Sequence, residues 1–232
     1  PNPSLPIAEM LLKCNDIDIS LKDDSGQTAL DKCVLASQND IKTIIEAKRV
    51  LNNTVRACRQ RYEQTGVASS AVLVAAVKAG NIDDVKLLIE DGNENVNKRG
   101  SGGVTPLIMA SWGNKIDIVA YLLNIPEVKV NLANDAGATA LHWSLSKSHF
   151  EIQRMLINDR RIDLLKSDKS NKPPIWYAAK YSNLDTVQLI LSKPNPELAK
   201  SIVQKATDGE TTALNSAKDE NIAKLLQQAL DY

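Results

Sequence analysis

A 34-residue period constrains the fold of this chain more than any other feature of its sequence. The segment GVTPLIMASWGNKIDIVAYLL is followed 34 residues later by GATALHWSLSKSHFEIQRMLI, with related apolar and small residues at matching positions. One aligned position is occupied at intervals of 34 residues by Ala71, Thr105, Thr139 and Pro173. A fixed period between about 20 and 50 residues indicates stacked repeats, in which each unit buries its apolar face against its neighbours. The sequence therefore predicts a repeat array.

Each copy contains the signals of two short helices. Thr105 is a good N-cap because its hydroxyl can accept a hydrogen bond from the first helical turn, and Pro106 suits the first helical position. The first helix is predicted over PLIMASW and the second over about 115–123, where apolar residues recur at helical spacing. Residues expected to end the first helices in a left-handed conformation, which serine adopts less readily than glycine or asparagine, are Gly80, Asn114, Ser148 and Asn183.

The segments between the helix pairs, and the ends of the array, differ from this pattern. EVKVNLANDAGA begins as extended chain and ends in a glycine-containing turn, which predicts a projecting, hairpin-like loop. The period is longer at both ends, because Thr28 lies 43 residues before Ala71 and Thr212 lies 39 residues after Pro173. The extra residues EAKRVLNNTVRACRQRYEQTG predict a lengthened second helix and a loop, a helical insertion at about 46–66.

Taken together, these segments resemble the ankyrin repeat. That motif joins a loop ending in Gly-x-Thr-Pro-Leu-His to a helix of small residues, a glycine and a second helix with Val-x-x-Leu-Leu. The chain has DSGQTALD from Asp24, GVTPLIMA from Gly103 and GATALHWS from Gly137, and the resemblance covers almost its whole length. The histidine of the motif is present only as His142. The resemblance implies that this imidazole hydrogen-bonds to nearby loop or threonine groups.

The resemblance implies an all-α fold, a solenoid of stacked helix–turn–helix units whose hairpin loops project to one side. We expect one array over residues 1–232. Its first part, 1–22, is a half repeat that contains only a second helix. Full repeats are expected to start near residues 23, 66, 100, 134 and 168, and a degenerate C-terminal cap from about residue 207.

Charge and hydropathy argue against several classes of protein. The chain has 28 basic and 28 acidic residues, so its formal net charge gives no general attraction to nucleic acid or to an anionic membrane. No apolar run reaches the roughly 18 residues that a membrane-spanning helix needs. The three cysteines, Cys14, Cys33 and Cys58, form no Cys-x-x-Cys pair, and we expect free thiols in a reducing compartment.

No pattern in the sequence indicates catalysis. The HExxH, GxSxG, phosphate-binding-loop and GxGxxG motifs are absent from the sequence, which contains only two histidines. The acidic pairs Asp23–Asp24 and Asp83–Asp84 lie in a loop and at a helix start, where exposure and the helix dipole explain them. We therefore expect no enzyme, no cofactor and no metal site.

Ankyrin arrays generally bind proteins through their loop tips and the exposed side of their first helices. Trp112 and Tyr181 occupy such outward positions and are typical hot-spot residues, although Trp112 could instead pack flat on a neighbouring helix. Lysines at these positions would favour a partner with an acidic segment. Deeper positions of the repeat, expected to belong to the core between repeats, are occupied by Met109, Trp143, Leu145 and Trp176. The full set of predicted partner-binding residues is Lys78, Lys98, Arg99, Ser101, Trp112, Asp135, Lys147, Lys169, Lys172, Lys180 and Tyr181.

The sequence thus predicts a monomeric, non-catalytic protein-interaction module in the cytoplasm or another intracellular reducing compartment. One alternative is a targeting or substrate-recruiting arm of a larger multidomain enzyme or of a secreted bacterial effector, acting then in the host cytosol. The leading half repeat and the missing initial methionine favour a piece cut from a longer chain. Another alternative is a small-molecule or nucleic-acid binder. Only the insertion supports it, with five basic and two acidic residues from Glu46 to Glu63, and a solvated helix face explains these charges more simply.

Overall fold

The computed structural model describes Gln27 and residues 39–66, 71–181, 184–192, 202–204 and 212–231, and within these ranges it contains helices and no strand. The described residues do not include the predicted half repeat 1–22, the motif copy from Asp24 apart from Gln27, Cys14, Cys33 or Asn183. The chain divides into two compact units, residues 1–72 with 83–95 and residues 73–82 with 96–232. The expectation of one continuous array stays a prediction.

The first unit contains two of the labelled helices. Helix α3 (Asn39–Glu63) has 25 residues, so the predicted insertion is helical and its helix begins earlier than residue 46. Val55, Cys58 and Tyr62 recur at helical spacing and are buried. Helix α5 (Ile82–Glu90) contributes the buried Val85 and Leu88. Hydrogen bonds from α3 to Asp84 of α5 join the two helices.

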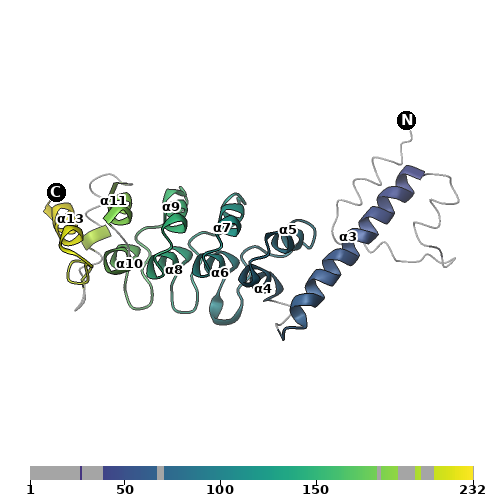
Figure 1. The fold of residues 1–232 in the computed structure, drawn as a ribbon, viewed down its shortest axis with the longest axis horizontal. Helices are drawn as coiled ribbons and strands as arrows, with labels where there is room; N and C mark the ends of the chain where they lie inside the picture. Colours follow the sequence, from purple (N-terminus) through teal and green to yellow (C-terminus); the bar gives the residue numbers. More distant parts are fainter. Residues whose placement is uncertain are drawn as a thin grey trace. The chain divides into compact units, whose positions relative to one another are not determined.

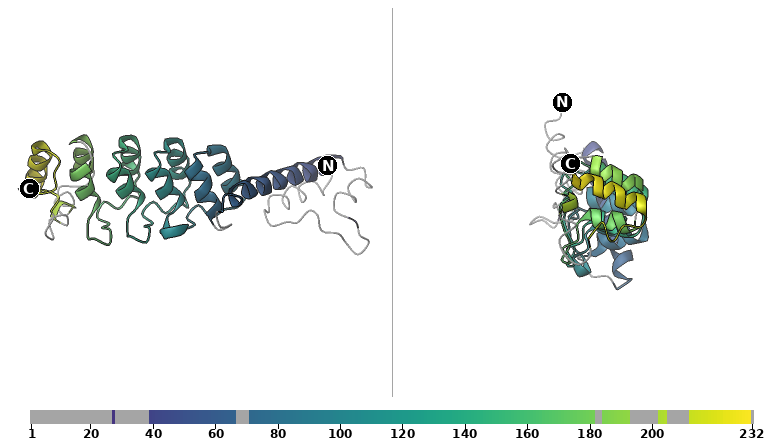
Figure 2. Two further views of the ribbon diagram at one scale, coloured as in Figure 1. Left: turned by 60° about the horizontal axis from the view of Figure 1, so that its bottom comes forward. Right: turned by 90° about the vertical axis from the view of Figure 1, so that its left-hand side faces the viewer.

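The second unit is a stack of helices in two layers, with the loops extending beyond the first helices (Figures 1 and 2). Within this unit, α6, α8 and α10 are each followed by a second helix, and neighbouring pairs contact one another along the stack. The first helices are α4 (Val72–Ala79), α6 (Pro106–Trp112), α8 (Ala140–Ser146) and α10 (Pro174–Tyr181). The second helices are α7 (Ile116–Leu123), α9 (Phe150–Asn158) and α11 (Leu184–Ser192), and α13 (Glu220–Asp231) contacts α11.

The helix boundaries follow the predicted signals. Thr105 Oγ1 accepts a hydrogen bond from Ile108 N at 3.2 Å, and Pro106 begins α6. His142 forms a capping box with Thr139, and its Nε2 lies 3.2 Å from the carbonyl oxygen of Lys172 in the next loop, as the resemblance implied. The predicted left-handed positions are confirmed where they are described, with φ of 82° at Gly80, 54° at Asn114 and 56° at Ser148.

Asn97 and Asn131 each connect the loop that carries them to the loop of the following repeat. Asn97 donates from Nδ2 to the carbonyl oxygen of Glu127 at 2.7 Å and accepts from Lys129 N at 2.7 Å. In the next copy, Asn131 makes the same two contacts with the main chain of Arg161 and Asp163, at 2.6 and 2.9 Å. These side chains act as bridges between repeats because each pairs with both a carbonyl and an N–H group of its neighbour.

The capping box makes stability depend on pH. Thr139 N–H donates to His142 Nδ1 at 3.2 Å, so the ring is neutral, and burial lowers the pKa of His142 below its ordinary 6.5. In the unfolded chain His142 takes up a proton near pH 6.5, whereas in the folded chain it stays neutral to a lower pH. The free energy of unfolding therefore falls as the pH drops below 6.5. We expect a slope of up to about 1.4 kcal/mol per pH unit in urea unfolding.

The matched variant is His142→Gln, because glutamine can complete a capping box without titrating in this range. The slope that His142 contributes between pH 7 and pH 5 should disappear in this variant. An equal slope in both proteins would assign the pH dependence to other groups.

Candidate protein-binding surface

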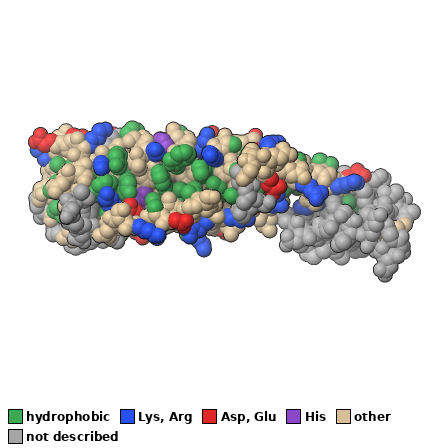
Figure 3. Space-filling model, turned by 90° about the horizontal axis from the view of Figure 1, so that it is seen from below, with side chains coloured by type: hydrophobic (Ala, Val, Ile, Leu, Met, Phe, Trp, Pro, Cys, Tyr) green, Lys and Arg blue, Asp and Glu red, His purple; other side chains and the backbone are tan. Residues whose placement is uncertain are grey.

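The predicted residues lie on the first helices and loops of the second unit. Seen from the side of the first helices, hydrophobic side chains gather along the middle of this face, with Lys and Arg side chains around them (Figure 3). The eleven residues, which we call the partner-facing set, are all described, and eight of them are exposed. The three that are half-buried are Lys98, Lys172 and Tyr181.

Trp112 ends α6 and remains accessible. Its exposed fraction is 43%, which is high for an aromatic side chain of this size. The alternative in which this indole packs flat against a neighbouring helix would remove most of that area from solvent. Trp112 therefore offers accessible apolar contact area.

Three aromatic rings form a cluster on α10. The ring centroids of Trp176 and Tyr177 are 5.1 Å apart, and the Tyr181 centroid lies 6.3 Å from Trp176 and 6.2 Å from Tyr177. Two lysines lie over this cluster: Lys172 Nζ is 4.0 Å from the Trp176 ring, and Lys180 Nζ is 4.9 Å from it. Cation–π attraction favours these positions, so both ammonium groups lie beside an aromatic surface.

Contacts with neighbouring residues hold the aromatic cluster in place. Tyr177 OH donates to Asp168 Oδ2 at 2.7 Å, and burial together with this hydrogen bond raises the pKa of Tyr177 above its ordinary value. The His142 ring meets Tyr177 edge-on at 5.3 Å. Asp168 also accepts from the backbone of Lys172 at 2.9 Å, which orders the loop that carries this lysine. The aromatic surface is therefore preformed.

Two of the predicted loop residues contact each other. Arg99 Nη2 and Asp135 Oδ1 form an ion pair of 2.7 Å between successive loops, although both side chains remain largely exposed. The main chain makes a parallel contact, because Asp135 N donates to the carbonyl oxygen of Gly102 at 2.9 Å. The two charges compensate each other, so the remaining charge of this set comes from its lysines.

Sequence reasoning misjudged one acidic residue and two apolar ones. Asp84 was expected to be exposed, but only 8% of it is accessible, because Tyr62 OH and Arg61 Nη1 donate to its Oδ2 at 2.6 and 2.7 Å. Trp143 and Met109, predicted as core together with Leu145 and Trp176, are only half-buried. Leu145 and Trp176 are buried as predicted.

The prediction that Cys58 is a free thiol is confirmed. Cys58 is a buried free thiol, and burial, followed by the Asp84 charge, raises its pKa to about 11. A thiol with a raised pKa is a poor nucleophile.

No group of three or more potential metal-ligating side chains occurs among the described residues. Within the same ranges, no helix is both long and apolar enough to cross a membrane.

Stacked helix pairs with one continuous, partly aromatic face define a helical repeat protein of the solenoid class. Ankyrin repeats (3 copies) match residues 50–134 and 127–201 of the chain. The chain belongs to the ankyrin-repeat family. Membership of this family supports a role for the chain as a protein-interaction module.

Several curated proteins are similar to this chain. The E3 ubiquitin-protein ligase XBAT33 of Arabidopsis thaliana is 32% identical over 81% of this chain and 33% of its own length. The ankyrin repeat and KH domain-containing protein mask-1 of Caenorhabditis elegans is 30% identical over 53% of this chain and 5% of its own length. The tyrosine-protein kinase HTK16 of Hydra vulgaris is 30% identical over 59% and 18%, respectively. The chain therefore spans a third or less of these relatives.

Proposed function

We propose that the partner-facing set binds an acidic segment of a protein partner. The observation that carries this proposal is the α10 cluster, in which Lys172 and Lys180 lie over the rings of Trp176 and Tyr181. Trp176 itself is 4% exposed, so the half-buried ring of Tyr181 provides the accessible aromatic surface of this cluster. This ring can accept apolar side chains while the neighbouring ammonium groups pair with carboxylates. Trp112 extends the accessible apolar surface to α6.

The charges of the first helices support an acidic partner. Helices α4, α6, α8 and α10 contain no aspartate or glutamate, whereas Lys78, Lys180 and, directly after α8, Lys147 lie at their C-terminal ends. Lysine at these ends also complements the helix dipole, so the pattern has a structural benefit as well. An acidic segment lying along these helices would meet no carboxylate on them. We propose that the module acts as a monomer in an intracellular reducing compartment, where Cys58 stays a free thiol.

Replacing both outward aromatic residues should weaken partner binding. We expect Trp112→Ala and Tyr181→Ala each to cost about 2 kcal/mol of binding free energy, roughly a thirtyfold loss of affinity. The matched control is Phe150→Ala, because Phe150 is 47% exposed but begins the second helix α9. The measurement is quantitative capture of cellular proteins by the full chain and by each variant, followed by affinity measurement with the captured partner.

Circular dichroism must first show that every variant is folded, because a lost packing contact would resemble a lost anchor. The proposal predicts one set of proteins that the wild type and Phe150→Ala retain and the double variant loses. Undiminished affinity of a folded Trp112→Ala, Tyr181→Ala variant would exclude this surface. Lys147→Glu should mainly slow association with an acidic partner.

A second candidate function is recruitment of substrates for a larger enzyme or a secreted effector. The small part of each relative that the chain matches supports this function, because the match covers 33% of the length of a ubiquitin ligase and 18% of the length of a tyrosine kinase. In this case the captured protein would be modified by a catalytic domain elsewhere in the same polypeptide. Sequencing the full-length transcript tests the idea, and a reading frame that encodes repeats alone would overturn it.

A further inference from the structure

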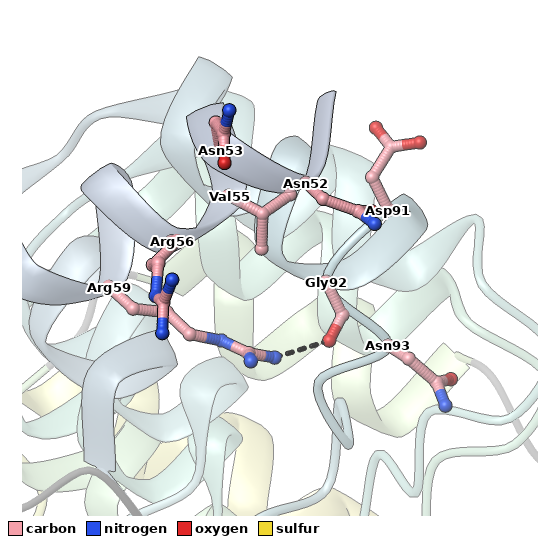
Figure 4. Close-up of a pocket in the computed structure, with 8 residues that line it drawn as sticks. All are labelled: Asn52, Asn53, Val55, Arg56, Arg59, Asp91, Gly92 and Asn93. Carbon is pink, nitrogen blue, oxygen red and sulfur yellow. Dashed lines mark hydrogen bonds between the residues drawn. The ribbon is translucent and has the colours of Figure 1, made fainter. Parts of the chain in front are cut away.

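A cleft in the first unit shares no residue with the partner-facing set. It lies between α3 and the loop after α5, and its volume is about 540 Å³, within the range of small-molecule sites. Five residues of α3 between Asn52 and Arg59 line one side, and residues 91–93 line the other. In Figure 4, the side chain of Asn52 extends toward Asp91, and Arg59 reaches Gly92.

Contacts within this unit fix the shape of the cleft. Arg59 donates from Nη2 to the carbonyl oxygen of Gly92 and forms an ion pair of 3.2 Å with Glu94. Gly92 permits the tight turn at the end of α5, since a Cβ there would lie 2.7 Å from the carbonyl oxygen of Leu88. The loop is therefore held against α3 before any ligand arrives, and Glu94 compensates the charge of Arg59.

Among the described residues, the remaining polar side chains of the cleft have no hydrogen-bond or ion-pair partner. Arg56 is exposed and forms no ion pair with any described residue. Asn52, Asn53 and Asn93 likewise have no side-chain hydrogen bond within the described part of the chain. One guanidinium group and three amide groups thus line a preformed concavity with their donors available. Guanidinium is suited to bidentate pairing with carboxylate or phosphate.

We propose that this cleft binds a small ligand that carries an oxyanion, either a carboxylate or a phosphate, next to a hydroxyl group. Arg56 pairs with the oxyanion, and the amides of Asn52 and Asn53 donate to its remaining oxygens. Asp91 lies on the facing loop and accepts a hydrogen bond from the hydroxyl group. The same carboxylate repels ligands with several negative charges, so it selects against polyanions.

The test titrates the full chain with inorganic phosphate, acetate, glycerol 3-phosphate, glycerol and, separately, a single-stranded oligonucleotide. Calorimetry gives the affinity, and the side-chain amide resonances of the asparagines report the place of binding. We expect saturable binding of at least one oxyanion, tighter binding of glycerol 3-phosphate than of inorganic phosphate, and none of glycerol. Comparing the affinities for inorganic phosphate and acetate shows whether the cleft prefers a phosphate or a carboxylate.

Matched variants separate the cleft from a generally basic helix. Arg56→Gln should weaken binding about tenfold or more, because it removes a charged hydrogen-bond donor from the ligand. Arg49→Gln makes the same change on the same helix outside the cleft, where Arg49 is also exposed, and should leave the affinity within about twofold. Asp91→Asn should strengthen the binding of inorganic phosphate and reduce the preference for glycerol 3-phosphate.

Three results would overturn the proposal. One is the absence of binding by every probe up to about 10 mM, which is weaker than a specific site would show. Another is equal weakening by Arg56→Gln and Arg49→Gln, which would indicate diffuse attraction to the helix. The third is binding of a single-stranded oligonucleotide alone, reduced alike by both variants, which would assign the basic residues of α3 to nucleic acid.

Discussion

Leu107→Ala is expected to lower the free energy of unfolding by about 2–5 kcal/mol, the range for a leucine truncated in a packed core. Leu107 is 3% exposed in α6, and this helix contacts both α7 and α8. A cavity at this point weakens the contact within one repeat and the contact with the next. Because repeats are stabilised by their neighbours, urea unfolding of the variant should become less cooperative as well as begin earlier.

Ile116→Ala is the comparison for this experiment. Ile116 is 40% exposed at the start of α7, so removing its side chain should cost less than about 1 kcal/mol. Both variants remove a branched aliphatic side chain from neighbouring helices. If the two lost similar amounts of stability, the assignment of Leu107 to the core would be wrong.

Arg161→Ala should cost about 2–3 kcal/mol, because one guanidinium group serves several main-chain acceptors. Its Nη2 donates to the carbonyl oxygen of Leu123 at 2.7 Å, and its Nη1 to that of Ile125 at 3.1 Å. Weaker contacts reach Pro126 and Val128, and Asp159 pairs with it at 2.6 Å. Arg161 thus holds the loop after α7 to the following repeat.

Arg160→Ala is the natural control, because the neighbouring Arg160 is exposed and should change stability by at most about 0.5 kcal/mol. The effect of Arg161 should also depend on pH. The hydrogen bond from Arg161 lowers the pKa of Asp159 below 3.8, so their mutual stabilisation is present above pH 3.8 and is lost as the pH falls further. Chemical denaturation of both variants from pH 7 to pH 3 measures this dependence. Equal losses of stability in Arg161→Ala and Arg160→Ala at pH 7 would contradict the role of Arg161.

The features that depend on a few adjacent residues were predictable from the sequence. Thr105 and Pro106 begin α6 because capping and proline geometry act over one helical turn. Ser148 adopts the left-handed position although serine does so less readily, since the period placed it where glycine or asparagine stands in other copies. The burial of Leu145 and Trp176 followed from the same alignment.

Contacts between distant segments were not predictable in this way. Asp84 is buried because Arg61 and Tyr62, 23 and 22 residues earlier, donate to it from the insertion, which has no counterpart in the period. Lys172, Lys180 and Tyr181 were selected individually as outward positions, and their shared contact with Trp176 was missed for a different reason. The i, i+4 spacing of Lys172, Trp176 and Lys180, and that of Tyr177 and Tyr181, was an available signal of this cluster.

The asparagine bridges explain how the copies can differ so much while keeping one period. The hydrogen bonds that Asn97 and Asn131 make across to the following repeat reach main-chain atoms, which are the same whatever side chains that repeat carries. A repeat held in this manner is free to accumulate substitutions on its outer surface, and a duplicated copy would be held as well as the original. The corresponding residue one period later is Leu165, so that exchangeability ends at the third copy.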